Sequence, residues 1–179
     1  MSDETITVVG LLLRKDGRLA VHDWGPHGWA PPAAHRHEWL GAADDVAETM
    51  AMAMGATTSG VQWAAATVQT THCSCASVED GETSHLWEVY RADAGEVGDP
   101  VASIPPIRWM ARDEILAAAR RTVSWAQGQI SDQEWVADPG IAPVWIYLLT
   151  CTGWISRYDG VREHELDEID RVRDRVLTL

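Results

Sequence analysis

The chain has 179 residues and carries 14 lysine and arginine side chains against 27 aspartate and glutamate side chains, a formal net charge of −13. A chain of this length fits one domain of roughly 100–200 residues, which can bury enough apolar surface to fold without metal or disulfide cross-links. The negative charge repels phosphate groups and the single lysine, Lys15, offers no basic patch, so nucleic acid and anionic membranes are excluded as expected partners.

The first predicted elements are a hairpin, a loop and a helix. Residues 7–13 and 19–22 are apolar runs typical of strands, and Asp16-Gly17 between them favours a tight turn. Residues 24–32 are rich in glycine, proline and tryptophan, which predicts a loop that is neither helix nor strand. In residues 41–54 apolar side chains recur at helical spacing, and the glycine that follows marks the end of this helix.

A second hairpin follows this helix. Residues 61–75 alternate between apolar and polar side chains, residues 84–91 alternate again, and the acidic segment 79–82 between them predicts a turn. Residues 92–106 are rich in glycine, proline and aspartate and predict a loop.

The last predicted elements are mainly helical. Residues 107–110 predict a short strand, residues 112–120 a helix and residues 142–152 a buried helix. Residues 161–179 predict an amphipathic helix with a narrow apolar stripe, which either packs on its own domain or makes a dimer contact. The stripe consists of Leu166, Ile169, Val172 and Val176.

Cysteine usage and the beginning of the chain predict a cytoplasmic protein. The three cysteines, Cys73, Cys75 and Cys151, have no spacing typical of a disulfide framework. Residues 1–7 are polar and acidic, unlike a signal peptide, and the longest apolar run, residues 144–149, is too short to cross a bilayer.

The order of these elements resembles the Nudix superfamily over roughly residues 5–122. Three segments carry the resemblance: residues 19–22 with the Gly28-Trp29 pair, residues 87–92, and residues 107–115. The resemblance implies an α/β fold, an α/β/α sandwich around a mixed sheet with extra C-terminal helices. It also implies a Nudix-like domain over residues 1–122 and a helical extension over residues 123–179 that packs on the same domain.

The signature of this superfamily is degenerate in the chain. The signature reads G-x5-E-x7-R-E-U-x-E-E-x-G-U, with U aliphatic, and is aligned here on Gly55 as its late glycine. The first glutamate then becomes Leu40, the Arg-Glu pair becomes Glu48-Thr49, and the Glu-Glu pair becomes Met52-Ala53. Because Mg²⁺ requires hard oxygen ligands, the missing carboxylates argue against the usual metal-dependent pyrophosphate cleavage.

Histidines gather in the segments that would surround a Nudix pocket. His35 and His37 in one short loop are candidates for acid–base catalysis, with Glu38 orienting one of them. His22 and His85 would line the opposite wall. Two alternatives stay open: a divalent transition-metal site from two or three of His22, His35, His37 and His85, or hydrogen-bonded histidines without chemistry. No other cofactor is expected.

Tryptophan is the main large apolar side chain, with 10 tryptophans and no phenylalanine. Trp29, Trp87 and Met52 are expected to shape the cavity of a small-molecule site. Core filling is the alternative for the tryptophans.

These features predict a Nudix-fold enzyme that catalyses a cyclisation, an isomerisation or an elimination of a small, partly apolar molecule. One alternative is an atypical hydrolase of a nucleoside-diphosphate-like substrate with displaced metal ligands such as Glu38, Glu48, Glu82 or Glu88. Another is a non-catalytic ligand-binding or sensor domain. The expected partners are a small-molecule ligand and, through the C-terminal stripe, a second copy in a homodimer.

Overall fold

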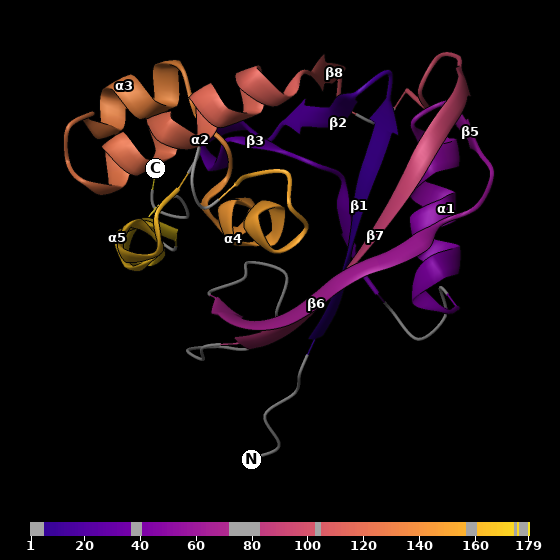
Figure 1. Cartoon of the computed structure of the whole chain (residues 1–179), viewed down its shortest axis with the longest axis horizontal. Helices are drawn as coiled ribbons and strands as arrows, with labels where there is room; N and C mark the ends of the chain where they lie inside the picture. Colours follow the sequence, from indigo (N-terminus) through magenta and orange to yellow (C-terminus); the bar gives the residue numbers. More distant parts are fainter. Residues whose placement is uncertain are drawn as a thin grey trace. The chain divides into compact units, whose positions relative to one another are not determined.

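The computed structural model of the chain describes residues 6–36, 41–71, 83–102, 105–156 and 161–173, together with Arg175 and Leu179. It consists of two units, the first made of Met1–Arg14 and Pro32–Ile104 and the second of Lys15–Pro31 and Pro105–Leu179. Both units contain strands and helices, so the mixed α/β fold that the sequence predicts is confirmed (Figure 1).

The first unit contains a mixed sheet around two long parallel strands, β1 (Ile6–Lys15) and β7 (Thr83–Val97). The three-residue strand β4 (Ala33–His35) pairs antiparallel with β1. On the other side, β5 (Ala56–Thr58) and β6 (Gln62–Thr71) pair antiparallel with β7. Strand β1 therefore has neighbours along both of its edges.

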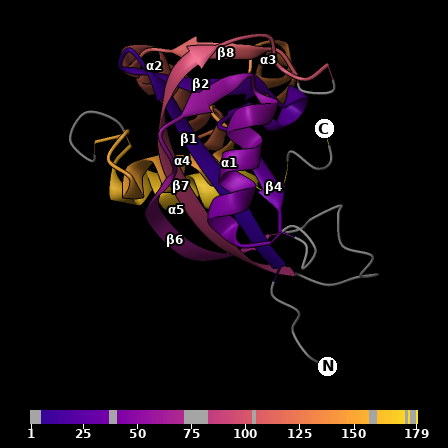
Figure 2. The same cartoon turned by 90° about the vertical axis from the view of Figure 1, so that its right-hand side faces the viewer.

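Helix α1 (Ala43–Ala53) packs against β5 and β7 (Figure 2). Its buried side chains recur at the helical spacing that the sequence predicts. Gly55 follows the helix with φ +76°, and a Cβ at this position would lie 2.7 Å from the carbonyl oxygens of Gly98 and Asp99. The helix therefore ends where the sequence predicts, at a position that only glycine fits. The buried helix residues are Ala43, Val46, Ala47 and Ala51.

Strand β7 is longer than the sequence predicts. The prediction of a loop from residue 92 is wrong, because Ala94 and Val97 pair with Thr58 and Ala56 of β5. Beyond the strand, the Gly98 N–H donates to the Gly55 carbonyl over 2.9 Å. Pairing with a distant segment outweighs the local preference of glycine and aspartate for turns.

The strands of the second unit are β2 (Arg18–Asp23), β3 (Trp29–Ala30) and β8 (Ile107–Met110), with β2 paired antiparallel to both others. The chain enters β2 through the predicted tight turn, in which Asp16 and Gly17 have φ of 51° and 73°.

The prediction that residues 24–32 form neither helix nor strand is wrong. The segment contains the single-turn helix η1 (Gly25–His27) and then β3. Gly28 has φ +97° and lies so close to Gly140 that a Cβ would be 2.7 Å from the Gly140 oxygen. The same oxygen accepts the Trp29 N–H over 2.8 Å. Glycine thus allows the reversal that pairs Trp29 with β2.

Four helices complete the second unit: α2 (Arg112–Ala126), α3 (Asp132–Ala137), α4 (Pro143–Cys151) and α5 (Glu163–Arg173). Helix α2 extends beyond the predicted residue 120 and runs across residue 122, where the sequence places a domain boundary. The helix predicted over residues 142–152 is confirmed as α4. No helix within the described ranges is long and apolar enough to cross a membrane.

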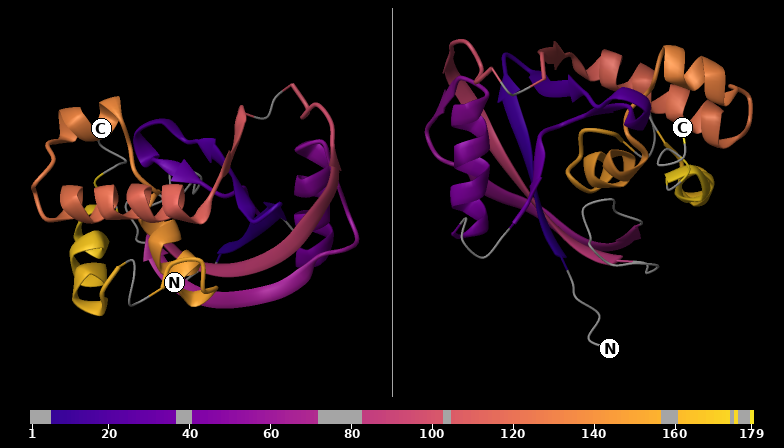
Figure 3. Two further views of the ribbon diagram at one scale, coloured as in Figure 1. Left: turned by 45° about the horizontal axis from the view of Figure 1, so that its top comes forward. Right: turned by 180° about the vertical axis from the view of Figure 1, so that it is seen from behind.

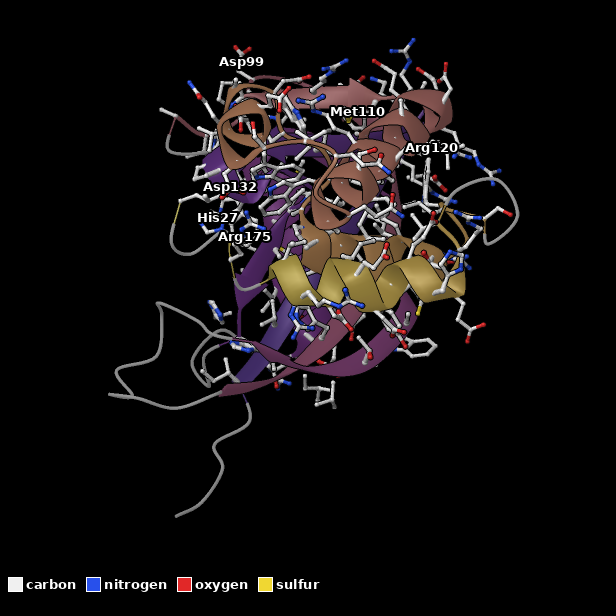
Figure 4. The ribbon with its side chains drawn as sticks, turned by 90° about the vertical axis from the view of Figure 1, so that its left-hand side faces the viewer. His27, Asp99, Met110, Arg120, Asp132 and Arg175 are labelled. Atoms are coloured by element: carbon white, nitrogen blue, oxygen red, sulfur yellow. The ribbon has the colours of Figure 1, made fainter. Side chains whose placement is uncertain are left out.

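Tryptophans fill the core of the second unit. The side chains of Trp125, Trp135 and Trp145 are at most 1% exposed, and the first two are stacked with ring centroids 4.2 Å apart. The Trp125 indole N–H donates to Asp132 over 2.9 Å, and Arg175 donates to the same carboxylate over 2.5 Å. Asp132 and Arg175 lie side by side in Figure 4. The core-filling interpretation thus holds for these three indoles.

The apolar stripe of α5 also belongs to this core. Ile169 and Val172 are 2% and 3% exposed, and α5 contacts α2 and α4. Leu166 is half-buried, and Val176 lies outside the described residues. The described part of the stripe therefore packs within its own unit, which agrees with the interpretation that the stripe packs on its own domain.

Candidate functional site

Two histidines meet on one face of the first unit's sheet. In the ladders around β1, Val8 is opposite His35 of β4 on one side and Trp87 of β7 on the other, and Ile6 is opposite His85. Opposed residues of neighbouring strands point to the same face, as do residues two apart in one strand. His35, His85 and Trp87 therefore share a face, and the two imidazole centroids lie 5.7 Å apart with the rings inclined at 51°.

The two imidazoles differ in their access to solvent. His85 is 2% exposed and Trp87 6% exposed, whereas His35 is half-buried. A planar ligand between two rings needs two contacts of about 3.5 Å, about 7 Å in all, so none fits between these imidazoles. A molecule arriving from solvent would therefore reach His35 more readily than His85.

The remaining residues of the predicted catalytic loop are not placed. His37 and Glu38 lie outside the described residues, and so does Glu82, one of the alternative metal ligands. His35 is therefore the only one of the three predicted catalytic residues that the described ranges contain.

Helix α1 presents few metal-binding groups at the signature positions. Thr49 is exposed, and its hydroxyl donates to the Asp45 carbonyl over 2.8 Å, a bond internal to the helix. Met52 is 61% exposed, and Glu48 is also exposed. The side chains of Thr49, Met52 and Ala53 do not fit the carboxylate ligand set that Mg²⁺ requires.

A second histidine group belongs to the second unit. The His22 imidazole lies 6.5 Å from the Trp24 ring centroid in an edge-on arrangement, and His27 lies 5.1 Å from the same indole. Burial lowers the pKa of His27 below its usual range. Burial also lowers the pKa of His22, with the Asp23 carboxylate opposing the effect.

Trp29, predicted to bind substrate, lies in the same unit. It is half-buried, and the Cζ atom of the Arg108 guanidinium lies over its ring, 5.6 Å from the ring centroid. Arg108 also donates to Glu114 over 2.7 Å. Arg108 was not among the predicted site residues, although its position in the short strand before α2 was an available signal.

A polar group lies on the opposite face of β7, and only its Glu88, one of the alternative metal ligands, is among the residues that the sequence singles out. Glu88 and Tyr90 alternate with Trp87 and therefore point away from the histidines. Burial raises the pKa of Tyr90, and the carboxylates of Glu88 and Asp44 raise it further. The Oε2 atom of Glu88 is buried and accepts no hydrogen bond from the described residues. The two-residue spacing of Glu88 and Tyr90 was the sequence signal for this group.

No three histidine, cysteine, aspartate or glutamate side chains come together as a metal site in the part of the chain that the structure describes. Of the four predicted transition-metal ligands, His35 and His85 are in ring contact, His22 belongs to the other unit and His37 is not described. The metal site stays a prediction.

Comparisons with known proteins identify the fold. Neither a protein-family model nor a curated protein matches the sequence. A NUDIX hydrolase from Nitrosomonas europaea is similar in structure, with 14% identity, coverage of 64% of this chain and 77% of that chain, and a TM-score of 0.50. The ORF135 protein of E. coli is also similar, with 14% identity, coverage of 65% and 80%, and a TM-score of 0.47. The likeness to the Nitrosomonas europaea structure shows that the chain has the Nudix-like fold that the sequence predicts.

Proposed function

We propose that the protein is a Nudix-fold enzyme that moves protons on a small, partly apolar molecule, and that it does not cleave pyrophosphate by the usual metal-dependent route. One observation carries the proposal: the imidazole rings of His35 and His85 lie side by side, with their centroids 5.7 Å apart, on the sheet face that also carries the buried Trp87. Imidazole gains and loses a proton near neutral pH, which suits acid–base catalysis.

The two imidazoles take different roles in this proposal. His35, which is half-buried, gives a proton to the ligand or takes one from it. His85, at 2% exposed, is a positioning residue that fixes the orientation of His35. Trp87 supplies apolar surface on the same face. His37 and Glu38, which lie outside the described residues, stay predicted as a second acid–base group and as a carboxylate that orients one of the two histidines.

The reaction class follows from these groups. Cyclisation, isomerisation and elimination need a proton removed at one atom and delivered at another, which a pair of acid–base groups supplies without an added oxidant or reductant. Cleavage of a diphosphate needs charge stabilisation that Thr49, Met52 and Ala53 of α1 do not offer.

A ligand screen by thermal unfolding tests the proposal first. The panel contains nucleotides with and without Mg²⁺, and apolar and aromatic metabolites. We expect a metabolite without a diphosphate to raise Tm, because a ligand at 100 times its Kd stabilises the folded state by about 2.7 kcal/mol. Stabilisation by Mg²⁺ nucleotides alone would contradict the proposal.

Substitution of the histidines then tests the roles. We expect His35→Ala to lower turnover of the identified ligand by roughly 10²–10⁴-fold. His85→Gln should lower turnover less and shift its pH profile. His164→Ala, an exposed histidine on α5, serves as the matched control. Full turnover in His35→Ala would rule out the acid–base role. Binding that is unaccompanied by turnover would instead support a ligand-binding or sensor domain.

A second candidate is hydrolysis of a nucleoside-diphosphate-like substrate with displaced ligands. The buried Glu88 Oε2, which accepts no hydrogen bond from the described residues, favours it, and the similar Nitrosomonas europaea structure is a NUDIX hydrolase. Phosphate release that requires Mg²⁺ or Mn²⁺ and is lost with EDTA and in Glu88→Gln would establish this function in place of the first.

A further inference from the structure

An arginine and a glutamate lie on the face of the first unit's sheet that is opposite the histidines. Val9 of β1 is opposite Ala34 of β4 on one side and Glu88 of β7 on the other, so these three residues share this face. Arg36 is two residues beyond Ala34, and its backbone N–H continues the ladder by donating to the Thr7 carbonyl over 2.8 Å. Arg36 and Glu88 therefore project from the same side of the sheet.

Neither of these two charged groups is fully paired among the described residues. The Arg36 Nε–H donates to the Gly41 carbonyl over 3.0 Å, and the two terminal nitrogens of this exposed guanidinium donate to no described residue. The Oε2 atom of Glu88 is buried and accepts no hydrogen bond from the described residues. A carboxylate oxygen that has left water without gaining a donor costs free energy. Glu88 therefore lacks a donor, and Arg36 can still bind an acceptor.

Tyr90 indicates that the two charges lie near each other. It is two residues beyond Glu88 in β7 and shares its face. The carboxylates of Glu88 and Asp44 add to the effect of burial in raising the pKa of Tyr90, and the Arg36 guanidinium lowers it. Asp44 lies in the first turn of α1, which runs along β7 (Figure 3). Two carboxylates and one guanidinium thus act on a single hydroxyl.

The signs of these charges indicate the chemistry of a ligand. A divalent cation fits poorly, because the Arg36 guanidinium would repel it and no group of three metal-binding side chains forms in the described part of the chain. An anion such as phosphate would be repelled by Glu88 and Asp44. A molecule that carries both an ammonium group and a carboxylate group offers each protein charge an opposite charge and a hydrogen bond.

We propose that this face binds a small zwitterion, whose ammonium group donates to Glu88 Oε2 and whose carboxylate accepts from the terminal nitrogens of Arg36. Leu86, half-buried two residues before Glu88 on the same face, supplies apolar contact for the carbon chain of the ligand. The site is independent of the proposed acid–base reaction, because the sheet separates it from His35 and His85.

Binding of amino acids of different length tests this site. The probes are glycine, β-alanine and γ-aminobutyrate, in which the distance between the two charges increases. Titration calorimetry on the full chain compares them with propylamine and propionate, which carry one charge each. We expect at least one amino acid to bind with a Kd of about 1 mM or lower, and at least about tenfold more tightly than either singly charged compound. Absence of binding by all three, or equal binding of a singly charged compound, would overturn the proposal.

Variants that remove one charge then assign the two ends of the ligand. Glu88→Gln and Arg36→Met should each raise the Kd of the bound amino acid at least about tenfold. Glu96→Gln and Arg91→Met make the same charge changes at exposed positions elsewhere on β7 and are the matched controls. Circular dichroism checks that every variant folds.

Two results of the variant experiment would contradict the site. An unchanged Kd in Glu88→Gln or Arg36→Met, or an equal increase in the matched controls, would overturn the proposal. Displacement of the bound amino acid by Mn²⁺ would assign Glu88 to a metal, as in the second candidate function, and would overturn it as well.

Discussion

The two histidine groups are held by different kinds of backbone. His35 and His85 lie on strands that flank β1, so the ladder register sets the 5.7 Å between their rings. His22 ends β2 and His27 lies in the single-turn helix η1, and Trp24 between them is 44% exposed. The comparison indicates that a site fixed by strand pairing depends on core packing, whereas a site fixed by a turn depends on single glycines.

The largest difference is expected when each group loses its tryptophan. Trp87→Ala removes a side chain that is 6% exposed and should lower the free energy of unfolding by about 3–5 kcal/mol. Trp24→Ala removes one that is 44% exposed and should cost less than about 1 kcal/mol. Urea unfolding measures both, and equal losses would contradict the distinction between the two groups.

The next largest effect concerns the glycine of the turn. Gly28→Ala should destabilise by roughly 2–3 kcal/mol, because it adds a clash to a strained backbone. Gly17→Ala has a similar positive φ, +73°, but its Cβ would meet nothing within 4 Å, and it is the matched control. Left-handed strain alone should cost the control about 1 kcal/mol. Equal destabilisation would mean that the contact with Gly140 is unimportant.

A smaller effect is expected at the surface of the second unit. Arg108→Met removes the guanidinium above Trp29 and should cost about 0.5–1 kcal/mol. Arg108→Lys keeps the charge but loses the planar group, so it should recover only part of this loss. Full recovery by lysine in thermal unfolding would assign the effect to the ion pair with Glu114 instead.

The smallest effect is expected from pH. Burial lowers the pKa of His22 and His27, so these residues bind fewer protons when folded than when unfolded. Above pH 6.5, the ordinary histidine pKa, both imidazoles are mainly neutral in the folded and the unfolded chain, and the stability is at its full value. As pH falls below 6.5, the unfolded chain binds protons more readily than the folded chain, so the free energy of unfolding decreases. The double variant His22→Gln/His27→Gln should lose less stability on acidification than the wild type. An equal loss in both would contradict the assignment.

Long segments with a strong pattern could be predicted from the sequence. The apolar runs of β1 and β2 and the helical spacing of α1 each indicate one structure by themselves. Strand β4 has only three residues after two prolines, and α3 only six, so neither repeats a pattern often enough to be recognised. Helix α3 nevertheless begins with a capping box from Ser131 to Glu134, a signal that was present.

The candidate site could be predicted only in part. His35 and His85 were both candidates in the sequence, but their contact depends on β4 and β7 lying on opposite sides of β1. That arrangement is a property of chain topology, which local patterns do not contain. Tyr90 and Asp44 were missed for the same reason, because they come together only through the packing of α1 against β7.

Because β1 is paired along both edges, the spacing of the two imidazoles is tied to the stability of the whole sheet. The amides of β1 that bond to β4 and β7 exchange with solvent only when these ladders open. Slow hydrogen exchange over Val8 to Gly10, the stretch opposite both β4 and β7, should therefore accompany an intact site. Motion of a surface loop would leave this geometry unchanged, whereas a partial unfolding event that frees β1 would abolish it at once.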